Sequence, residues 1–245
     1  MKLYERSIYA SDFTSLTYTG VTDASAAIDN DRDTIVRSLT ADPDLTLTAP
    51  EMRTADSVWI KTTGYTNVEI IADGVSLGSQ SIPTTGNYAG YVYREFTETT
   101  ALVWTLRFTG TGGVWEAYLQ KKILDFDTDD KRPLKIRVSV FSGLYERTAS
   151  GDIAAFRAFG FGGGDATITL EWELLDNAST AELFEAWKSS TPRNREMAVF
   201  PRPTLEPDGF YQVQWISDFA FKYTGLNASQ GQSGSALFQE LDTQA

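Results

Sequence analysis

Apolar and polar positions alternate with a period of two along most of this chain, and that pattern predicts β-strands. Leu102, Trp104, Leu106 and Phe108 are separated by Val103, Thr105 and Arg107, and every second position from Ala166 to Leu174 is again apolar. A period of two gives a strand one face for the core and one for solvent, as in antiparallel sheets. Further strands are predicted at 134–140, 211–215 and 219–223.

Turn residues separate the predicted strands of the first 122 residues. Asp73-Gly74 lies between the β-like runs 68–71 and 75–77, and this dipeptide suits the positive φ angles of a type I′ hairpin turn. The segment Pro83–Asn87 predicts another loop. We therefore predict an antiparallel β-sandwich of the jelly-roll kind for this region.

One α-helix is predicted, at about residues 178–189. Ser179 and Glu182 have the spacing of a capping box, which satisfies free amides at a helix start. Three apolar residues then fall on one helical face, and this face is expected to pack on a sheet: Leu183, Phe184 and Trp187.

A charge-dense segment, residues 125–133, divides the two β-rich regions and ends in a proline. It predicts a linker between a jelly-roll domain at 1–124 and a second domain at 134–245. The fold class is thus mostly β: two antiparallel β-sandwich domains, the second with one flanking helix.

The amino-acid composition excludes several classes of function. The 245 residues include no cysteine and no histidine, so thiol nucleophiles, a Ser-His-Asp triad and Cys/His zinc sites are excluded. The net charge of −12 disfavours binding to nucleic acid or to anionic membranes. No apolar run approaches the roughly 20 residues of a membrane-spanning helix, and no secretory signal is visible. A structural or binding protein, not an enzyme, is favoured.

Two carboxylate patterns allow other interpretations. Glu171 and Glu173 lie on one polar strand face, so a carboxylate glycosidase remains a third hypothesis beside solvated or interface charges. The loop 24–34 collects oxygen donors of the kind calcium prefers, although an acidic solvated turn has the same composition.

The glycine-rich segment 160–165 lacks the Lys-Ser/Thr of a phosphate-binding loop and predicts a loop between strands.

The stretch Ala27-Ile28-Asp29-Asn30-Asp31 with Asp33-Thr34 resembles the A-x-DG-x-x-x-T-x-W loop of discoidin-like (F5/8 type C, galactose-binding-like) domains. The resemblance covers about residues 5–122 and implies a jelly roll. It also implies a structural calcium ion, held at the matching positions Asp29, Asp31, Thr34 and Glu116. Asn30 replaces the usual glycine, and Ile35-Val36 stands where that family has tryptophan.

Sugar binding by such a domain requires exposed aromatic residues with polar partners. Tyr88, Tyr91 and Tyr93 follow the loop Pro83–Asn87 and are the candidate carbohydrate-binding residues. Core packing and a contact between subunits remain alternative roles for these three tyrosines.

Residues 132–241 resemble the tube-type β-sandwich, with one helix, of distal tail and tail-tip proteins from long-tailed bacteriophages. The resemblance rests on the order of elements and on Phe200-Pro-Arg-Pro203 after the helix. It implies a homo-oligomeric ring, expected to be a hexamer, around the tail channel. The implied partners are the tail tube, hub and tape measure proteins, in a virion made in the host cytoplasm. Residues 143–164 are a candidate arm onto the neighbouring subunit.

The leading hypothesis from sequence is therefore a structural component of a phage-type tail tip. In this hypothesis the jelly roll decorates a ring formed by the second domain, with host glycan as a further candidate partner. The alternative is a carbohydrate-binding protein that uses the jelly roll.

Overall fold

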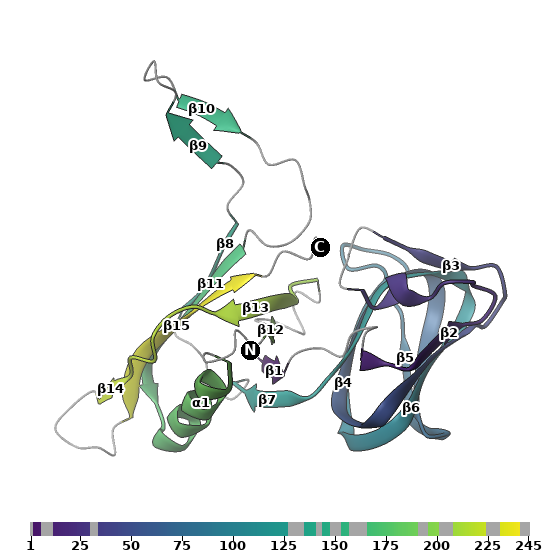
Figure 1. Cartoon of the computed structure of the whole chain (residues 1–245), viewed down its shortest axis with the longest axis horizontal. Helices are drawn as coiled ribbons and strands as arrows, with labels where there is room; N and C mark the ends of the chain where they lie inside the picture. The colour runs from purple at the N-terminus through teal and green to yellow at the C-terminus, as the bar shows by residue number, and fades with distance from the viewer. Residues whose placement is uncertain are drawn as a thin grey trace. The chain divides into compact units, whose positions relative to one another are not determined.

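The computed structural model describes residues 2–5, 12–29, 34–126, 135–140, 144–147, 153–156, 166–190, 196–200, 208–223 and 231–240. It is mostly β, with antiparallel pairing and one α-helix, which confirms the predicted fold class (Figure 1). The contacts divide the chain into two compact units. The first contains Met1–Asp125 and Met197–Tyr211, and the second contains Phe126–Glu196 and Gln212–Ala245.

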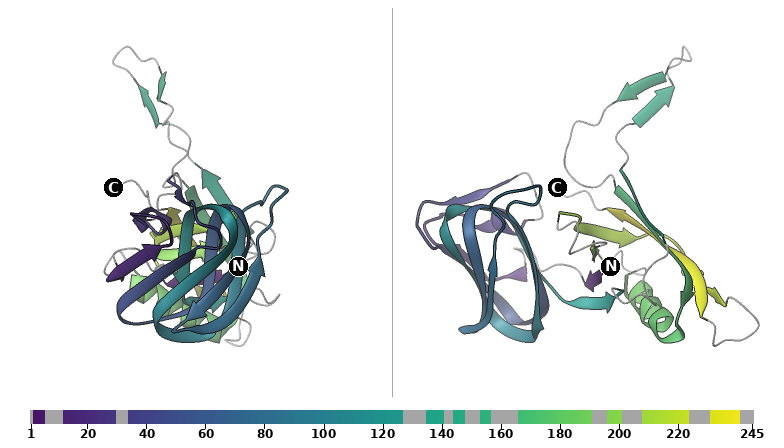
Figure 2. Two further views of the ribbon diagram at one scale, coloured as in Figure 1. Left: turned by 90° about the vertical axis from the view of Figure 1, so that its right-hand side faces the viewer. Right: turned by 180° about the vertical axis from the view of Figure 1, so that it is seen from behind.

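The first unit is built around two long, curled strands that pair with each other twice. Leu106 lies opposite both Leu45 and Ile70, and Ile60 lies opposite both Val92 and Ala117. Each long strand therefore passes from one layer to the other, and the result is a two-layer sandwich (Figure 2). Its elements are a 3-10 turn η2 (Ser25–Ala27) and the strands β2 (Ser15–Tyr18), β3 (Val36–Ser38), β4 (Asp44–Ala72), β5 (Val75–Ser81) and β6 (Tyr91–Gln120).

The two layers follow from the pairing register. One layer contains, in spatial order, residues 15–18, 44–48, 101–109, 65–72 and 75–81. The other contains residues 36–38, 112–120, 57–63 and 91–95.

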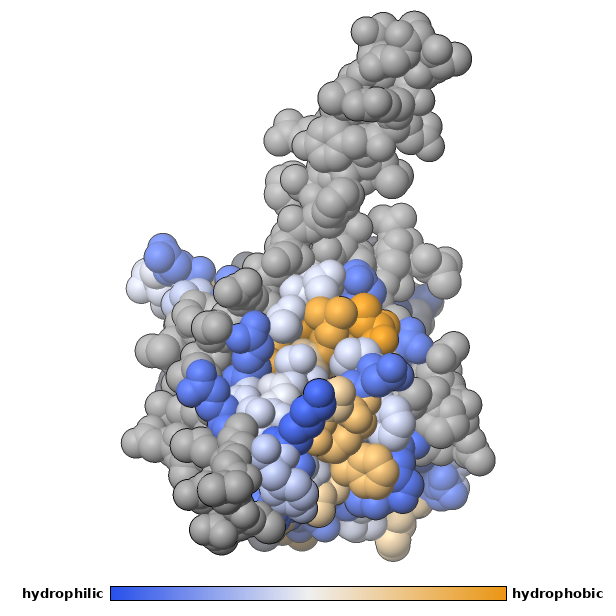
Figure 3. Space-filling model, turned by 90° about the vertical axis from the view of Figure 1, so that its left-hand side faces the viewer, coloured by the Kyte–Doolittle hydropathy of each residue, from blue (hydrophilic) through white to orange (hydrophobic). Residues whose placement is uncertain are grey.

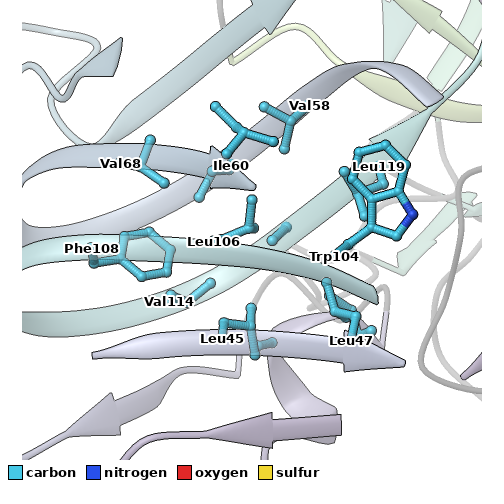
Figure 4. Packing of buried hydrophobic residues seen from close by; sticks show 14 of the residues in the cluster. Leu45, Leu47, Val58, Ile60, Val68, Trp104, Leu106, Phe108, Val114 and Leu119 are labelled. Atoms are coloured by element: carbon cyan, nitrogen blue, oxygen red, sulfur yellow. The ribbon is translucent and has the colours of Figure 1, made fainter. Parts of the chain in front are cut away.

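The core lies between the layers, and side chains such as Leu106 and Ile60 enter it from opposite sides (Figure 4). Trp104, Leu106 and Phe108 are buried, as the alternating pattern predicts. Leu102, the first residue of the same pattern, is 38% exposed, so this part of the prediction is wrong. Its amide donates to the carboxylate of Asp73, which places Leu102 beside a turn at the edge of the core.

The predicted hairpin is confirmed. Asp73 and Gly74 have φ angles of 46° and 82°, and Ala72 pairs with Val75 across them. Both turn residues thus adopt the left-handed conformation that a type I′ turn needs.

Three further strands complete the first unit: β1 (Lys2–Glu5), β7 (Lys122–Asp125) and β12 (Met197–Phe200). β1 pairs antiparallel with β7 on one side and with β12 on the other. The strands that lead into and out of the jelly roll are therefore neighbours, so the jelly roll is an insertion between them.

Segment 197–211 belongs to this first unit, whereas the sequence predicted 134–245 as one domain. The alternating pattern could not reveal this, because periodicity shows that a segment is a strand but not which strand it pairs with. Most of the predicted linker 125–133 lies outside the described residues, and that boundary stays a prediction.

An aromatic cluster covers the outer face of the layer that contains residues 57–63 and 112–120. It contains Trp59 and Tyr118 from the sandwich, Tyr4 from β1, and Phe200 and Phe210 from the later segment, all fully buried. Trp59 stacks on both Tyr118 and Phe210, with ring centroids 5.4 and 5.3 Å apart. The strand around Trp59 is thus buried on both faces, which explains its uninterrupted apolar run.

The second unit contains a sheet in the order β13-β15-β11-β8, with a short strand β14 beside β15. The strands are β8 (Lys135–Val140), β11 (Ala166–Leu175), β13 (Tyr211–Trp215), β14 (Lys222–Tyr223) and β15 (Gln232–Glu240). In addition, β9 (Leu144–Arg147) and β10 (Ile153–Phe156) pair with each other in a two-stranded sheet.

Two strand predictions for this unit need correction. The alternation along β11 holds for Ile168, Leu170 and Trp172, but the pairing with β15 shifts before Leu175, which is the next buried residue described. A bulge of this kind adds a residue and changes which positions face the core. Of the predicted strand 219–223, only Lys222–Tyr223 is a strand.

The helix α1 (Asn177–Ser190) confirms the predicted segment within one residue at each end. Its start differs from the prediction, because Asp176 provides the cap. The Asp176 carboxylate accepts hydrogen bonds from the amide and the hydroxyl of Ser179, at 2.8 and 2.7 Å. Asp176 precedes the helix, whereas Ser179 lies within it, so the predicted capping box starts three residues too late.

Candidate functional site

The jelly roll has one end at which its chain enters and leaves, and an opposite end made of loops. Ser15, the first residue of β2, pairs with Thr48, and the outgoing Gln120 pairs with Ser57, so both chain connections lie at the same end. The other end, called the loop end below, contains residues 19–29, 34–43, 63–66, 82–90 and 109–113.

Backbone hydrogen bonds hold the loop end together. The amide of Thr62 donates to the carbonyl of Gly90 at 2.8 Å, and the amide of Gly90 donates to the carbonyl of Pro83 at 2.7 Å. Asp42, at φ 52°, accepts a hydrogen bond from the Gly110 amide on its carboxylate at 2.6 Å. These bonds fix two loops to the ends of β4 and β6, so the loop end is a structured surface.

At Gly90 two backbone segments of the loop end approach each other closely. Its φ is 83°, and a Cβ atom at this position would lie 2.0 Å from the carbonyl oxygen of Thr62. Only glycine combines that backbone conformation with that distance.

The loop end displays both apolar and polar groups. Leu39 is 94% exposed, Tyr88 is half-buried, and Asn87 is exposed beside it. A partly exposed ring with amide groups nearby is a chemistry that suits a sugar, which stacks its apolar face on a ring and hydrogen-bonds through its hydroxyls.

The other two candidate tyrosines pack within the aromatic cluster. Tyr91 lies 6.0 Å from Trp59, and Tyr93 meets Phe200 edge to face at 5.0 Å. The Tyr93 hydroxyl also donates to Glu95 at 2.7 Å. The packing role that the sequence left open for Tyr91 and Tyr93 thus fits their contacts, and sugar binding by either stays a prediction.

Burial raises the pKa of Tyr93 well above its usual value, and the neighbouring Tyr4 acts in the same direction. Tyr93 is therefore neutral across the physiological range and acts as a hydrogen-bonding group, not as a base.

The predicted calcium ligands are only partly described. Asp29 is exposed, Thr34 is half-buried and Glu116 is fully buried, while Asp31 lies outside the described residues. Within the described ranges, no three acidic side chains are grouped so as to hold a metal ion. Because Asp31 is missing from that set, calcium binding stays a prediction.

The pair proposed for glycoside hydrolysis lies on β11. Glu171 pairs with Lys135 of β8 and is half-buried, and Glu173 is exposed. A role of this pair in glycoside hydrolysis stays a prediction.

A charge cluster that sequence reasoning missed joins β1, β6 and β7. Lys2 Nζ lies 2.6 Å from Glu95 Oε1 and 3.3 Å from Asp125 Oδ2. Lys122 Nζ lies 3.1 Å from each of the same two oxygens. Lys2 and Glu95 are 93 positions apart, and no local pattern signals such a pair.

The second unit carries a surface of a different kind. Figure 3 shows apolar side chains gathered on one of its faces. The rings of Phe184 and Trp187 on α1 both contact Phe219, and Ile216 and Tyr223 are among the exposed residues of this unit. No helix in the described part of the chain is long and apolar enough to cross a membrane.

No protein-family model matches this sequence, and no curated protein matches it. Solved structures that match part of the chain include carbohydrate-binding modules of family 32 from Clostridium perfringens. The module of NanJ, in complex with galactose, is 18% identical with a TM-score of 0.40, over 48% of this chain and 99% of that one.

Two structures of ZmpB from the same organism also match. The structure containing its modules and M60 catalytic domain is 17% identical with a TM-score of 0.42, over 48% of this chain. The two-module structure with GalNAc is 14% identical with a TM-score of 0.41, over 47% of this chain. The present chain spans 14% and 36% of those two structures. At these TM-scores the likeness defines neither a family nor a ligand.

Proposed function

We propose that this is a non-catalytic binding protein whose inserted jelly roll binds carbohydrate at the loop end. The observation that carries the proposal is the position of that end, opposite the paired strands β1 and β7 through which the jelly roll is attached. An insertion attached at one end presents the other end to solvent and to ligands.

The chemistry of the loop end supports a sugar as the ligand. Tyr88 offers a partly exposed ring, and Asn87 and the neighbouring backbone supply hydrogen-bonding groups. The hydrogen bonds of Gly90 hold this loop in one conformation, which lowers the entropy that binding must overcome.

Binding of the full-length protein to a glycan array, followed by calorimetry on the strongest sugar, tests the proposal. Tyr88→Ala is expected to weaken binding about fivefold, since one stacked ring contributes roughly 1 kcal/mol. The control is Val75→Ala, because Val75 is 65% exposed but lies in the Asp73-Gly74 turn at the opposite end. No sugar bound on the array, or equal loss in both variants, would contradict the proposal.

A second function is favoured by one observation in the other unit. β9 and β10 form a two-stranded sheet of their own within the segment 143–164. A two-stranded sheet is only marginally stable alone in water, so we propose that it docks on a neighbouring copy in a ring of the phage tail-tip kind.

Light scattering and negative-stain microscopy of the purified protein test ring formation. Closed rings, expected to be hexamers, would be lost when residues 144–156 are replaced by a short Gly-Ser linker. A protein that remains monomeric at high concentration would rule out this second function but would leave carbohydrate binding untouched.

A further inference from the structure

Two lysines and two acids from three strands form one closed cluster in the first unit. Lys2 belongs to β1, Glu95 to β6, and Lys122 and Asp125 to β7. Each lysine contacts the same two oxygens, Glu95 Oε1 and Asp125 Oδ2. Glu95 is the member from the jelly roll, so the cluster links the inserted sandwich to the strands that flank it.

Lys2 is the most deeply buried member of this cluster. Its side chain is 8% exposed, whereas those of Glu95 and Asp125 are 36% and 35% exposed. A buried ammonium group requires hydrogen-bonded counterions, since it has lost most of its hydration. The bond to Glu95, at 2.6 Å, is shorter than the contact with Asp125.

We propose that this cluster is an acid-sensitive latch that fixes β1 to the jelly roll. When Glu95 is protonated, the ammonium group of Lys2 stays buried but loses the nearer of the carboxylates of Glu95 and Asp125. Strand Lys2–Glu5 then separates from its neighbours, and Lys2 regains water. The proposal does not depend on carbohydrate binding.

Other titratable groups face the cluster, and none replaces Glu95. The hydroxyls of Tyr93 and Tyr4 are hydrogen-bonded to each other, and Tyr93 also donates to Glu95. Both are neutral, because burial raises the pKa of each. Asp56 accepts the Lys122 amide, and burial raises the pKa of Asp56, so its protonation weakly favours the folded state in acid.

The direction of the pH effect follows from the shifts in pKa. Burial acts to raise the pKa of Glu95, but hydrogen bonds from Lys2, Tyr93 and Lys122 outweigh it and bring the pKa below the ordinary 4.5. The stabilisation from Glu95 is therefore complete above pH 4.5 and is lost as the pH falls through the lowered value.

The two lysines determine the alkaline end of the pH range over which the cluster is stabilising. Burial acts to lower the pKa of Lys2 and of Lys122, but their acidic partners outweigh it and raise each above 10.5. Their contribution is present below pH 10.5 and is lost only above it. The latch is thus closed at neutral pH and opens in acid.

Amide hydrogen exchange of the full-length protein tests the latch. Glu95→Gln removes the charge at all pH values, so the amides of β1 should lose protection about tenfold at pH 7, which corresponds to roughly one charge-assisted hydrogen bond. The control is Glu98→Gln, which removes another acid of β6, with an exposed ion pair to Lys121 at 3.8 Å. Unchanged protection in Glu95→Gln, or equal loss in the control, would overturn the proposal.

A second variant keeps the test decisive if Glu95→Gln unfolds the whole unit. Lys2→Met removes the buried charge, so protection of β1 should no longer fall as the pH is lowered from 6 until Glu95 is protonated. The amides of Trp104 and Leu106, deep in the jelly roll, report whether the unit itself stays folded at each pH. A fall in β1 protection as large as that of the natural sequence, with the core intact, would show that Lys2 and Glu95 form no latch.

Discussion

The short strand segment around Trp59 packs on both of its faces. Val58 and Ile60 enter the sandwich core, while the ring of Trp59 lies on the opposite face among Tyr118 and Phe210. Val58, Trp59 and Ile60 are all fully buried, so removing the indole leaves a cavity that water cannot fill favourably.

We therefore expect Trp59→Ala to lower the free energy of unfolding of the full chain by about 3–5 kcal/mol. Leu39→Ala, at a side chain 94% exposed, should change it by less than about 0.5 kcal/mol. Urea denaturation followed by circular dichroism gives both values. A loss below about 1 kcal/mol for Trp59→Ala would show that the aromatic cluster adds little.

Substitutions at two glycines test two different causes of destabilisation, a steric clash and an unfavourable backbone conformation. A Cβ at Gly112 would lie 2.0 Å from the carbonyl oxygen of Thr63 in the paired strand. At Gly74 nothing lies within 4 Å, but φ is 82°. We predict that Gly74→Ala costs about 1 kcal/mol, from its left-handed conformation alone. Gly112→Ala should cost more, because backbone must move. Thermal unfolding of the two variants ranks them, and the reverse order would refute the register of β4 and β6.

At the scale of elements, the sequence pattern predicts local structure where local residues determine it. The hairpin at Asp73-Gly74 is correct because its turn conformation depends on those two residues. The helix is correct because its apolar face repeats within the segment. The start of α1 was misassigned because Asp176 and Ser179 are both good capping residues, and only the structure shows which carboxylate or hydroxyl accepts the free amide.

The cap can be tested by substitution. Asp176→Ala removes the acceptor of the Ser179 amide and hydroxyl and should destabilise the second unit by about 1 kcal/mol. Glu182→Ala should have almost no effect, since the predicted capping box does not form. Denaturation monitored by helical circular dichroism gives both values, and a larger effect at Glu182 would restore the capping box.

At the scale of the whole molecule, the limit of sequence reasoning is pairing between distant segments. Of the candidate site residues, Tyr91 and Tyr93 follow a loop and were natural choices for a ligand, yet their rings contact Trp59 and Phe200. Phe200 lies more than 100 positions later in the chain. Neither composition nor periodicity carries information about that contact, and the charge cluster at Lys2 was missed for the same reason.

The first unit is composed of two chain segments that lie far apart in the sequence. Phe210 is fully buried against Trp59, Tyr118 and Tyr4, so its ring stabilises strands that precede it by about ninety positions or more. Phe210→Ala should therefore lower the exchange protection of amides at 57–61 and 116–120.

The matched control is Phe184→Ala, the same substitution at a ring that is 38% exposed on α1 of the second unit. It should leave those amides unchanged, since Phe184 contacts Trp187 and Phe219 within its own unit. If Phe210→Ala altered exchange only near residue 210, the jelly roll would be stable without the later segment. The jelly roll would then not need the aromatic cluster for its stability. Loss of protection in both strands would instead show that the contact with Phe210 is part of its fold.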